Sequence, residues 1–340
     1  MRGILKRETW RPGVFAAAVL LAMSVSATPA QAQGTGKTLV PMGCTVGIEM
    51  HTPGVMTAGL ASTSGGAPSP AALAGVLPGD LITEIGGTSI EGVKDFQSAI
   101  ESLSGETTVT VRRGEQTMKL AITPDYSSGR AELGLWLRDS ISGIGTLTYY
   151  DPETGRFGGL GHAICDVDTG IIVPLGSGCI LESSVVGVVK GIEGTPGELR
   201  GSFDINNQRG TIESNTGHGI FGVLDVGTPD ADEALPVASE DEIELGKATV
   251  RSNITGQVVE EFELEIVRVY HDDYSGRTMM LKITDPRLLE LTGGIVQGMS
   301  GSPIIQNGRL VGAVTHVMLA DPTSGYGVSA EKMLTESAAS

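Results

Sequence analysis

A serine in a turn flanked by glycines, near the C-terminal end, is the residue best suited to nucleophilic chemistry. The stretch Gly298-Met299-Ser300-Gly301-Ser302-Pro303 can form a tight turn that exposes the Ser300 hydroxyl. The amides of Gly298 and Ser300 would then be placed to donate to the oxyanion of an acyl-transfer reaction. An ordinary hairpin turn gives the same local pattern, so this motif needs a partner before it indicates catalysis.

A serine hydroxyl needs a general base, and His162 is the best candidate among the five histidines. It lies between small residues in Gly161-His162-Ala163, and small neighbours let an imidazole reach a cleft. The order of histidine before serine is that of serine proteases built from two β-barrels. His316, in the strand expected after Ser300, suits the core or a cleft wall instead.

A third group should orient the imidazole and stabilise its positive charge. Asp285, at the end of a predicted strand before Ser300, is the preferred candidate. In two-barrel proteases the acid comes from the first barrel, which would favour Asp204 or Asp225. All three aspartates stay open on the residues alone.

Composition excludes several classes of function. The chain has 340 residues, of which 49 are glycine and only 4% are aromatic, a mixture that favours turn-rich β structure. Its 40 acidic and 23 basic residues give a net charge of −17, which argues against a nucleic-acid partner. The sequence has no CxxC or HExxH pattern, so we expect neither a metal nor a cofactor. A Cys165–Cys179 disulfide is an open alternative to three free thiols.

The N-terminus reads as a targeting segment. A basic start containing Arg2, Lys6 and Arg7 precedes an apolar run over 14–25, and Ala30-Gln31-Ala32 offers a cleavage site. We therefore expect residues 1–32 to be a signal peptide or a signal anchor. The protein would be exported, and this segment would associate with the membrane before cleavage.

Residues 39–124 are predicted to form one compact domain. Strand patterns over 81–85 and 107–112 flank an amphipathic helix over 93–103. The stretch Ala74-Gly75-Val76-Leu77-Pro78-Gly79-Asp80 resembles the turn of a bacterial PDZ domain. The resemblance implies binding of peptide C-termini, or of the chain itself, by β-augmentation. Its carboxylate loop is expected at Gly43, Val46, Gly47 and Ile48, although packing against a neighbouring domain is the alternative role.

Residues 131–340 alternate short apolar runs with turn residues, which predicts a second domain made of a pair of β-barrels. The fold class is therefore mainly β, with an α+β PDZ domain in front of a trypsin-like double barrel. The second domain resembles the SpoIVB peptidase family (stage IV sporulation protein B) along its whole length. The stretches that carry this resemblance are 133–140, 143–151, 159–164, 284–303, 312–317 and 321–327.

The family resemblance places its catalytic histidine, acid and serine on His162, Asp285 and Ser300. It implies an autoprocessing serine endopeptidase with a signalling role in sporulation. Such a protein would be released from the forespore into the space between two membranes. There it would cleave a regulator of an intramembrane metalloprotease, which activates a late sigma factor. A general envelope quality-control protease and a non-catalytic PDZ adaptor are the alternatives.

Overall fold

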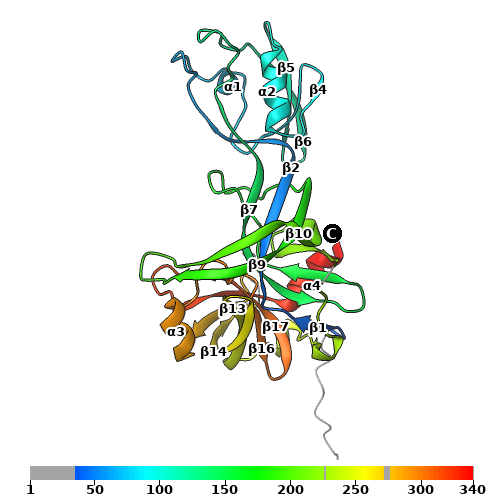
Figure 1. Cartoon of the computed structure of the whole chain (residues 1–340), viewed down its shortest axis with the longest axis vertical. Coiled ribbons are helices and arrows are strands. Elements are labelled where there is room, and N and C mark those ends of the chain that lie inside the picture. Colours follow the sequence, from blue (N-terminus) through cyan, green and yellow to red (C-terminus); the bar gives the residue numbers. More distant parts are fainter. Residues whose placement is uncertain (1–34, 226, 272–275, 340) are drawn as a thin grey trace, which may run out of the picture. The chain divides into compact units, whose positions relative to one another are not determined.

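The computed structural model describes residues 35–225, 227–271 and 276–339 (Figure 1). The expected signal segment, residues 1–32, lies outside the described residues. Within the described part, no helix is long and apolar enough to cross a membrane. Cys44, Cys165 and Cys179 are all free thiols, so the open alternative of a Cys165–Cys179 disulfide is not formed.

Six antiparallel strands form a first barrel. They pair in the order β7-β8-β11-β10-β9-β2, and β2 then closes the ring by pairing with β7. Their bounds are β2 Thr45–Leu60, β7 Leu135–Tyr150, β8 Arg156–Gly159, β9 Ser177–Val189, β10 Glu198–Thr216 and β11 Gly219–Leu224. Two short strands, β1 (Thr38–Pro41) and β12 (Leu235–Pro236), extend this sheet beyond β7.

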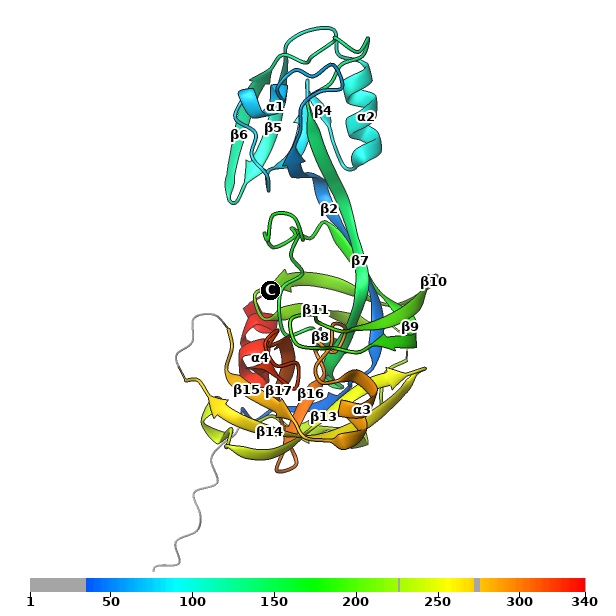
Figure 2. The same ribbon diagram turned by 90° about the vertical axis from the view of Figure 1, so that its left-hand side faces the viewer.

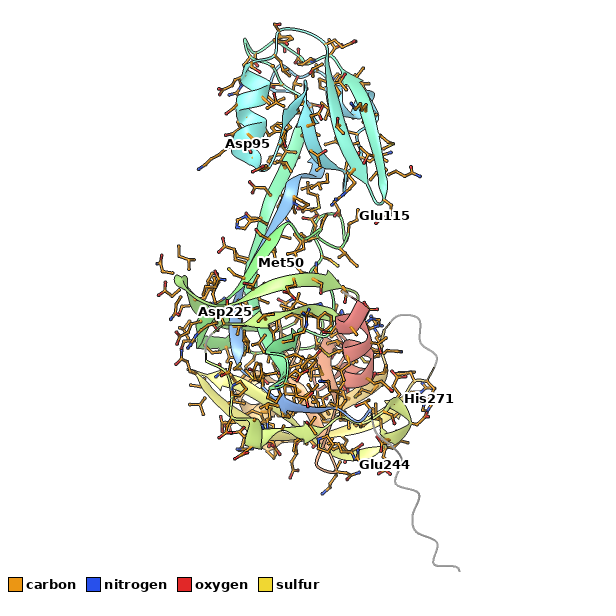
Figure 3. All side chains as sticks on the ribbon, turned by 90° about the vertical axis from the view of Figure 1, so that its right-hand side faces the viewer. Met50, Asp95, Glu115, Asp225, Glu244 and His271 are labelled. Carbon is orange, nitrogen blue, oxygen red and sulfur yellow. The ribbon has the colours of Figure 1, made fainter. Side chains whose placement is uncertain are left out.

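Alternating apolar residues explain why the first barrel closes around a core. On β2, Val46, Ile48 and Met50 all point inward and are buried; Met50 is labelled in Figure 3. A strand turns alternate side chains to opposite faces, so this period of two gives the barrel its apolar interior. Phe157 and Ile220, from β8 and β11, fill the same core.

A second closed barrel follows, with strands in the order β13-β14-β15-β18-β17-β16 (Figure 2). Their bounds are β13 Gly246–Thr255, β14 Val258–Val269, β15 Met279–Ile283, β16 Pro303–Gln306, β17 Arg309–Val317 and β18 Ser324–Ser329. Phe262, Leu264 and Ile266 alternate along β14 and are buried in its core. The short helix α3 (Pro286–Thr292) follows β15, and α4 (Ala330–Ala339) packs Met333 against the barrel.

Six other helices and strands form a small α+β unit. They are α1 Pro70–Leu73, β3 Leu81–Ile85, β4 Thr88–Ser89, α2 Val93–Glu101, β5 Thr107–Arg113 and β6 Gln116–Ile122. Asp80 of the PGD turn is fully buried, accepting from the Leu77 amide and from the Arg113 guanidinium at 2.9 and 2.7 Å. A buried charge held in this way is fully paired, which explains the residue's place in the motif.

The strand β2 is shared between this unit and the first barrel, which corrects the expected domain boundary at residue 39. Residues 45–51 pair with β9 and with the far half of β7, inside the barrel. Only the end of β2, from Val55 onward, pairs with β3. The small unit is therefore inserted between two barrel strands. The predicted fold class, mainly β with a double barrel, is confirmed.

Candidate active site

Two glycines with positive φ shape the turn that carries Ser300. Gly298 has φ +96° and Gly301 has φ +97°, a backbone region that L residues rarely adopt. A Cβ on Gly301 would lie 2.0 Å from the Thr146 carbonyl oxygen and 2.6 Å from the Leu160 nitrogen. The glycine therefore lets the second barrel approach the backbone of the first barrel directly beside the serine.

Thr146 of the first barrel fixes two carbonyls of this turn. Its amide donates to the Ser300 carbonyl at 3.1 Å, and its hydroxyl donates to the Gly298 carbonyl at 2.7 Å. Within the described chain, the amides of Gly298 and Ser300 donate no hydrogen bond. Two unpaired N–H groups flanking a serine hydroxyl form the donor pair that an oxyanion requires.

His162 follows two consecutive residues in the left-handed region. Leu160 has φ +65° and Gly161 has φ +70°. Strained non-glycine backbone of this kind is held by its surroundings and clusters at functional sites. A Cβ on Gly161 would lie 2.9 Å from Thr315 Cγ2, so this segment packs against β17 of the second barrel.

The tautomer of His162 follows from its backbone contact. Its Nδ1 lies 2.8 Å from the carbonyl oxygen of Ala163. A carbonyl only accepts, so Nδ1 carries the proton and Nε2 has a free lone pair. Burial lowers the pKa of His162 below its usual 6.5, and the contact with Ala163 partly opposes this shift. The ring is therefore a neutral base at neutral pH.

A second histidine lies against the first. The ring centroids of His162 and His316 are 4.9 Å apart, and the ring planes are inclined at 39°. His316 is exposed overall, but desolvation of its ring by neighbouring residues is the largest cause that lowers its pKa, to about 4, and the charges of His162 and Arg277 add to it. His316 thus stays neutral beside His162 at neutral pH.

The Ser300 hydroxyl makes a different contact in this structure. It donates to the carbonyl of Thr315 at 2.6 Å, and the described residues show no hydrogen bond between Ser300 and His162. An irregularity in the pairing of β17 with β18, between Val314 and His316, falls at this carbonyl. Catalytic hydrogen bonds often form fully only when substrate is bound, and a rotation of the Ser300 side chain would bring its hydroxyl from Thr315 toward His162.

One cavity of about 500 Å³ brings these groups together. It lies between the two barrels and is lined by Gly298, Ser300, His162 and His316, among others. Three of the four residues predicted for the catalytic machinery therefore share one site. No Asp or Glu of the described chain lines this cavity.

The structure gives Asp285 another role, which corrects its prediction as the acid beside His162. It is buried at the start of α3, where its carboxylate accepts from the Arg287 amide at 2.9 Å. The Arg287 guanidinium and the Glu263 amide also donate to it, at 2.9 and 3.2 Å. The hydrogen bond from Arg287 lowers the pKa of Asp285. Both oxygens thus serve a helix cap and an ion pair.

The two alternative acids also lie away from the cavity. Asp204 is exposed within β10, where the pairing with β9 is irregular, and it accepts from the Asn206 amide. Asp225, labelled in Figure 3, follows β11 and is exposed. The group that orients His162 in this structure is the Ala163 carbonyl. This group could not be predicted from the sequence, because every residue has a backbone carbonyl and none is marked by its residue type.

The residues predicted for the peptide loop of the PDZ domain belong to the first barrel, which is a second correction. Val46 and Ile48 are buried in its core, and Gly47 packs against Phe203 of β10. Gly43 lies just before β2 and touches Arg251 of the second barrel. Residues 45–51 of β2 already pair with β7 on one side and with β9 on the other, so this part of the strand has no open edge for a peptide.

A groove of about 580 Å³ runs beside α2 instead. Phe96 and Ile100 of α2 line one wall, and Leu135 and Trp136 of β7 line the other. The turn before β7 contains Gly134, with φ +69°, between two leucines. This apolar-glycine-apolar pattern is the sequence feature that could have located the carboxylate-binding loop of the PDZ domain here.

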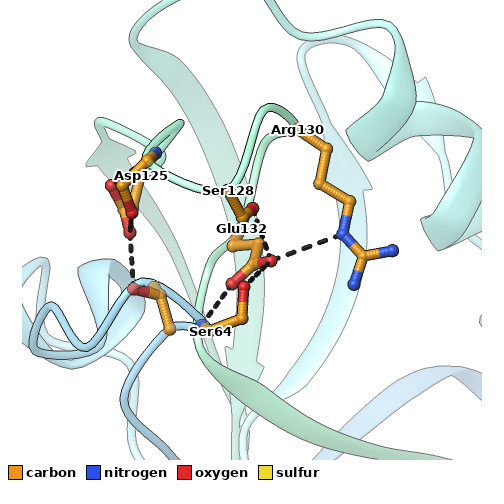
Figure 4. Close-up of polar contacts among 7 residues, drawn as sticks. Ser64, Asp125, Ser128, Arg130 and Glu132 are labelled. Atoms are coloured by element: carbon orange, nitrogen blue, oxygen red, sulfur yellow. Dashed lines mark hydrogen bonds and ion pairs between the residues drawn. The ribbon is translucent and has the colours of Figure 1, made fainter.

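Glu132 ties this turn to a neighbouring loop (Figure 4). It accepts from the amide and hydroxyl of Ser64 at 2.7 and 2.5 Å, and from the Ser128 hydroxyl at 2.8 Å. Arg130 adds a contact at 3.3 Å. The hydrogen bonds from Ser64 lower the pKa of Glu132 to about 2. The turn that borders the groove is thus held by an ionised carboxylate.

Fold and site together define a serine peptidase of two β-barrels with an inserted PDZ domain. The family model of the SpoIVB peptidase S55 matches residues 129–334, and a PDZ domain model matches residues 62–113. The chain belongs to the SpoIVB peptidase S55 family. The suspected family is confirmed.

More distant similarities add little detail. A Synechocystis protein whose name describes it as a serine protease, HhoB, is 34% identical over 84 residues. That match covers 22% of this chain and only 20% of the relative. The Rv3671c protease of M. tuberculosis in its active form is 15% identical, with a TM-score of 0.34, over 58% of this chain and 74% of that one. Its inactive form gives 16% identity and the same TM-score, over 58% and 83%.

Proposed function

We propose that Ser300 is the nucleophile and His162 the general base of an exported signalling endopeptidase. The observation that carries the catalytic part is the shared cavity, in which a neutral imidazole and a serine hydroxyl lie beside two unpaired amides. No cofactor is needed for this chemistry, because acyl transfer to serine requires only a base and oxyanion donors.

The reaction begins when the Ser300 hydroxyl turns from the Thr315 carbonyl to His162 Nε2. His162 takes the hydroxyl proton as Ser300 attacks the scissile carbonyl, and the amides of Gly298 and Ser300 hold the oxyanion. His162 then gives the proton to the leaving amine, and water hydrolyses the acyl-enzyme by the same route. The Ala163 carbonyl keeps Nδ1–H in place throughout.

The biological part of the proposal rests on family membership. A signalling peptidase of sporulation would cleave a regulator of an intramembrane metalloprotease and process itself. The N-terminal segment would deliver it across the membrane and anchor it before cleavage. The groove beside α2 would bind peptide C-termini, either of substrates or of a second copy of the chain.

Mapping of new protein N-termini in cells tests this assignment against its alternatives. Cells carrying the wild-type chain, Ser300→Ala, or the distant control Ser98→Ala on α2 are compared. A signalling peptidase gives a few cleavages that vanish only in Ser300→Ala. Many cleavages in unfolded proteins would indicate quality control. Normal function of Ser300→Ala would indicate a PDZ adaptor.

A further inference from the structure

The cavity at Ser300 is free of formal charge, although the chain as a whole is strongly charged. Charged residues make up 19% of the sequence, and the net charge is −17. Yet in the described part of the chain no Asp, Glu, Lys or Arg lines this cavity. Its walls are mostly aliphatic, and its titratable groups are two histidines of lowered pKa and the thiol of Cys165.

The proposed roles of Ser300 and His162 divide this cavity into two sides. His162 must reach the leaving amine, so the leaving side lies along its own segment, next to Ile164 and Val167. The acyl side then lies along the walls contributed by the barrel that carries Ser300. Those walls are Val296 and Val317, from the segments before the serine turn and at the end of β17.

The acyl-side wall is rigid as well as apolar. Val296 is 1% exposed and packs in the core of the second barrel, as does its neighbour Ile295. Gly325 of β18 pairs with Val317, and a Cβ there would lie 2.6 Å from Ile295 Cδ1. Gln297 contributes an amide side chain at the exposed rim, and its backbone pairs with Gly197 and Leu199.

We infer that this subsite selects an uncharged aliphatic side chain on the P1 residue, whose carbonyl Ser300 attacks. The inference rests on the proposed function of Ser300 and names its substrate class. An aliphatic side chain loses only water on entering such a wall. A charged side chain would be desolvated with no opposite charge in the cavity to pair with it, which is costly.

Peptidyl diphenyl phosphonates that differ only at P1 test this inference on the full chain. They phosphonylate an active serine, so their rate of labelling reports the subsite without a known substrate. We expect the valine and leucine probes to label Ser300 at least about 100-fold faster than the lysine and aspartate probes. Equal rates, or faster labelling by a charged probe, would overturn the inference.

Two variants of Val317 sharpen the test. Val317→Lys should slow the valine probe and speed the aspartate probe by roughly tenfold or more, because the new ammonium pairs with the P1 carboxylate. Val317→Thr, which keeps the shape without a charge, should keep the wild-type ranking. If Val317→Lys changes neither probe, the wall is not at the P1 side chain and the inference fails.

A simple alkyl fluorophosphonate separates the two possible failures. If it labels Ser300 while the phosphonates show no aliphatic preference, the proposed nucleophile stands and the subsite inference is wrong. If it does not label Ser300 in the wild-type chain, the proposed function fails and the subsite assignment falls with it. The same reagent confirms that each Val317 variant is folded and active before its ranking is read.

Discussion

The ring of His316 packs against the ring of His162 at a centroid distance of 4.9 Å. His162 is therefore held by a second imidazole and by the Ala163 carbonyl, in a cavity that no carboxylate of the described chain enters. A carbonyl orients the imidazole and keeps its tautomer, but it stabilises the imidazolium less than a carboxylate does. The site thus depends on packing to keep its base in place.

Removal of the His316 ring should loosen His162. We expect His316→Ala to lower kcat by about 10- to 100-fold with little change in KM, because orientation of the base acts on the chemical step. His316→Phe, which keeps a ring at this position, should retain most of kcat. Steady-state kinetics on a fluorogenic peptide measure both. A loss in His316→Phe as large as in His316→Ala would instead assign the imidazole a chemical role.

The pH dependence of catalysis should reflect the lowered pKa of the partly buried His162. Because burial lowers its pKa, the base stays neutral below pH 6.5, and the acid limb of kcat/KM should have its midpoint below 6.5. His316→Ala, which lets water reach His162, should move that midpoint upward. A wild-type midpoint at or above 6.5 would contradict the described burial.

The same two histidines should make folding stability fall in mild acid. Their pKa values are lowered in the folded state, so the unfolded chain binds more protons between pH 6.5 and about 4. The contribution of these histidines to stability is therefore complete above pH 6.5 and declines as the pH falls through this window. Urea unfolding at several pH values measures the decline, which His162→Gln should reduce. If the decline in His162→Gln equals that of the wild type, other groups cause the loss of stability.

Substitution of Asp285 should affect stability rather than chemistry. Asp285→Ala removes the cap of α3 and the partner of Arg287, so we expect a loss of about 1–2 kcal/mol. Asp285→Asn keeps the capping oxygen and should lose less. The fluorophosphonate labelling rate of folded protein should be unchanged in both, as in the exposed control Asp95→Ala. A loss of labelling by orders of magnitude in Asp285→Asn would restore this residue as the catalytic acid.

Two glycines of similar backbone conformation provide a matched pair. Gly301 and Gly308 have φ of +97° and +72°, but only at Gly301 would an added Cβ meet other atoms within 4 Å. Gly308→Ala should cost about 1 kcal/mol for its left-handed backbone alone. Gly301→Ala should cost more than about 3 kcal/mol, because the Thr146 and Leu160 backbones must move. Equal losses of unfolding free energy in the two variants would mean that the backbones of Thr146 and Leu160 move at little cost.

The signals that singled out Ser300 and His162 are local, and the structure places both residues at one cavity. Ser300 lies between residues that suit a tight turn, and His162 follows a glycine in both sequence and structure. The prediction of Asp285 as the acid also rested on a local signal, but the structure engages its carboxylate with Arg287. Asp285-Pro286 is the signature of a helix N-cap followed by proline at the first helical position, and the structure forms that cap. A triad acid, in contrast, is defined by distances across the fold.

The peptide loop was misplaced because the PDZ domain is inserted in the middle of a barrel. Alternation along β2 continues from one unit into the other, and alternation does not reveal which strand pairs with which half. The turn at Gly134 lies in a stretch that resembles the peptidase family, so the sequence assigned it to the second domain and not to the groove beside α2. Only the pairing of β2 with β3, β7 and β9 separates the two units.

Fluorophosphonate labelling of the full chain tests the central claim most directly. The wild-type protein should be labelled stoichiometrically, with the adduct located at Ser300 by mass spectrometry. His162→Gln should slow the labelling by several orders of magnitude, by analogy with the loss of a catalytic base, and Ser300→Ala should abolish it. Labelling of either variant at the wild-type rate would contradict the account.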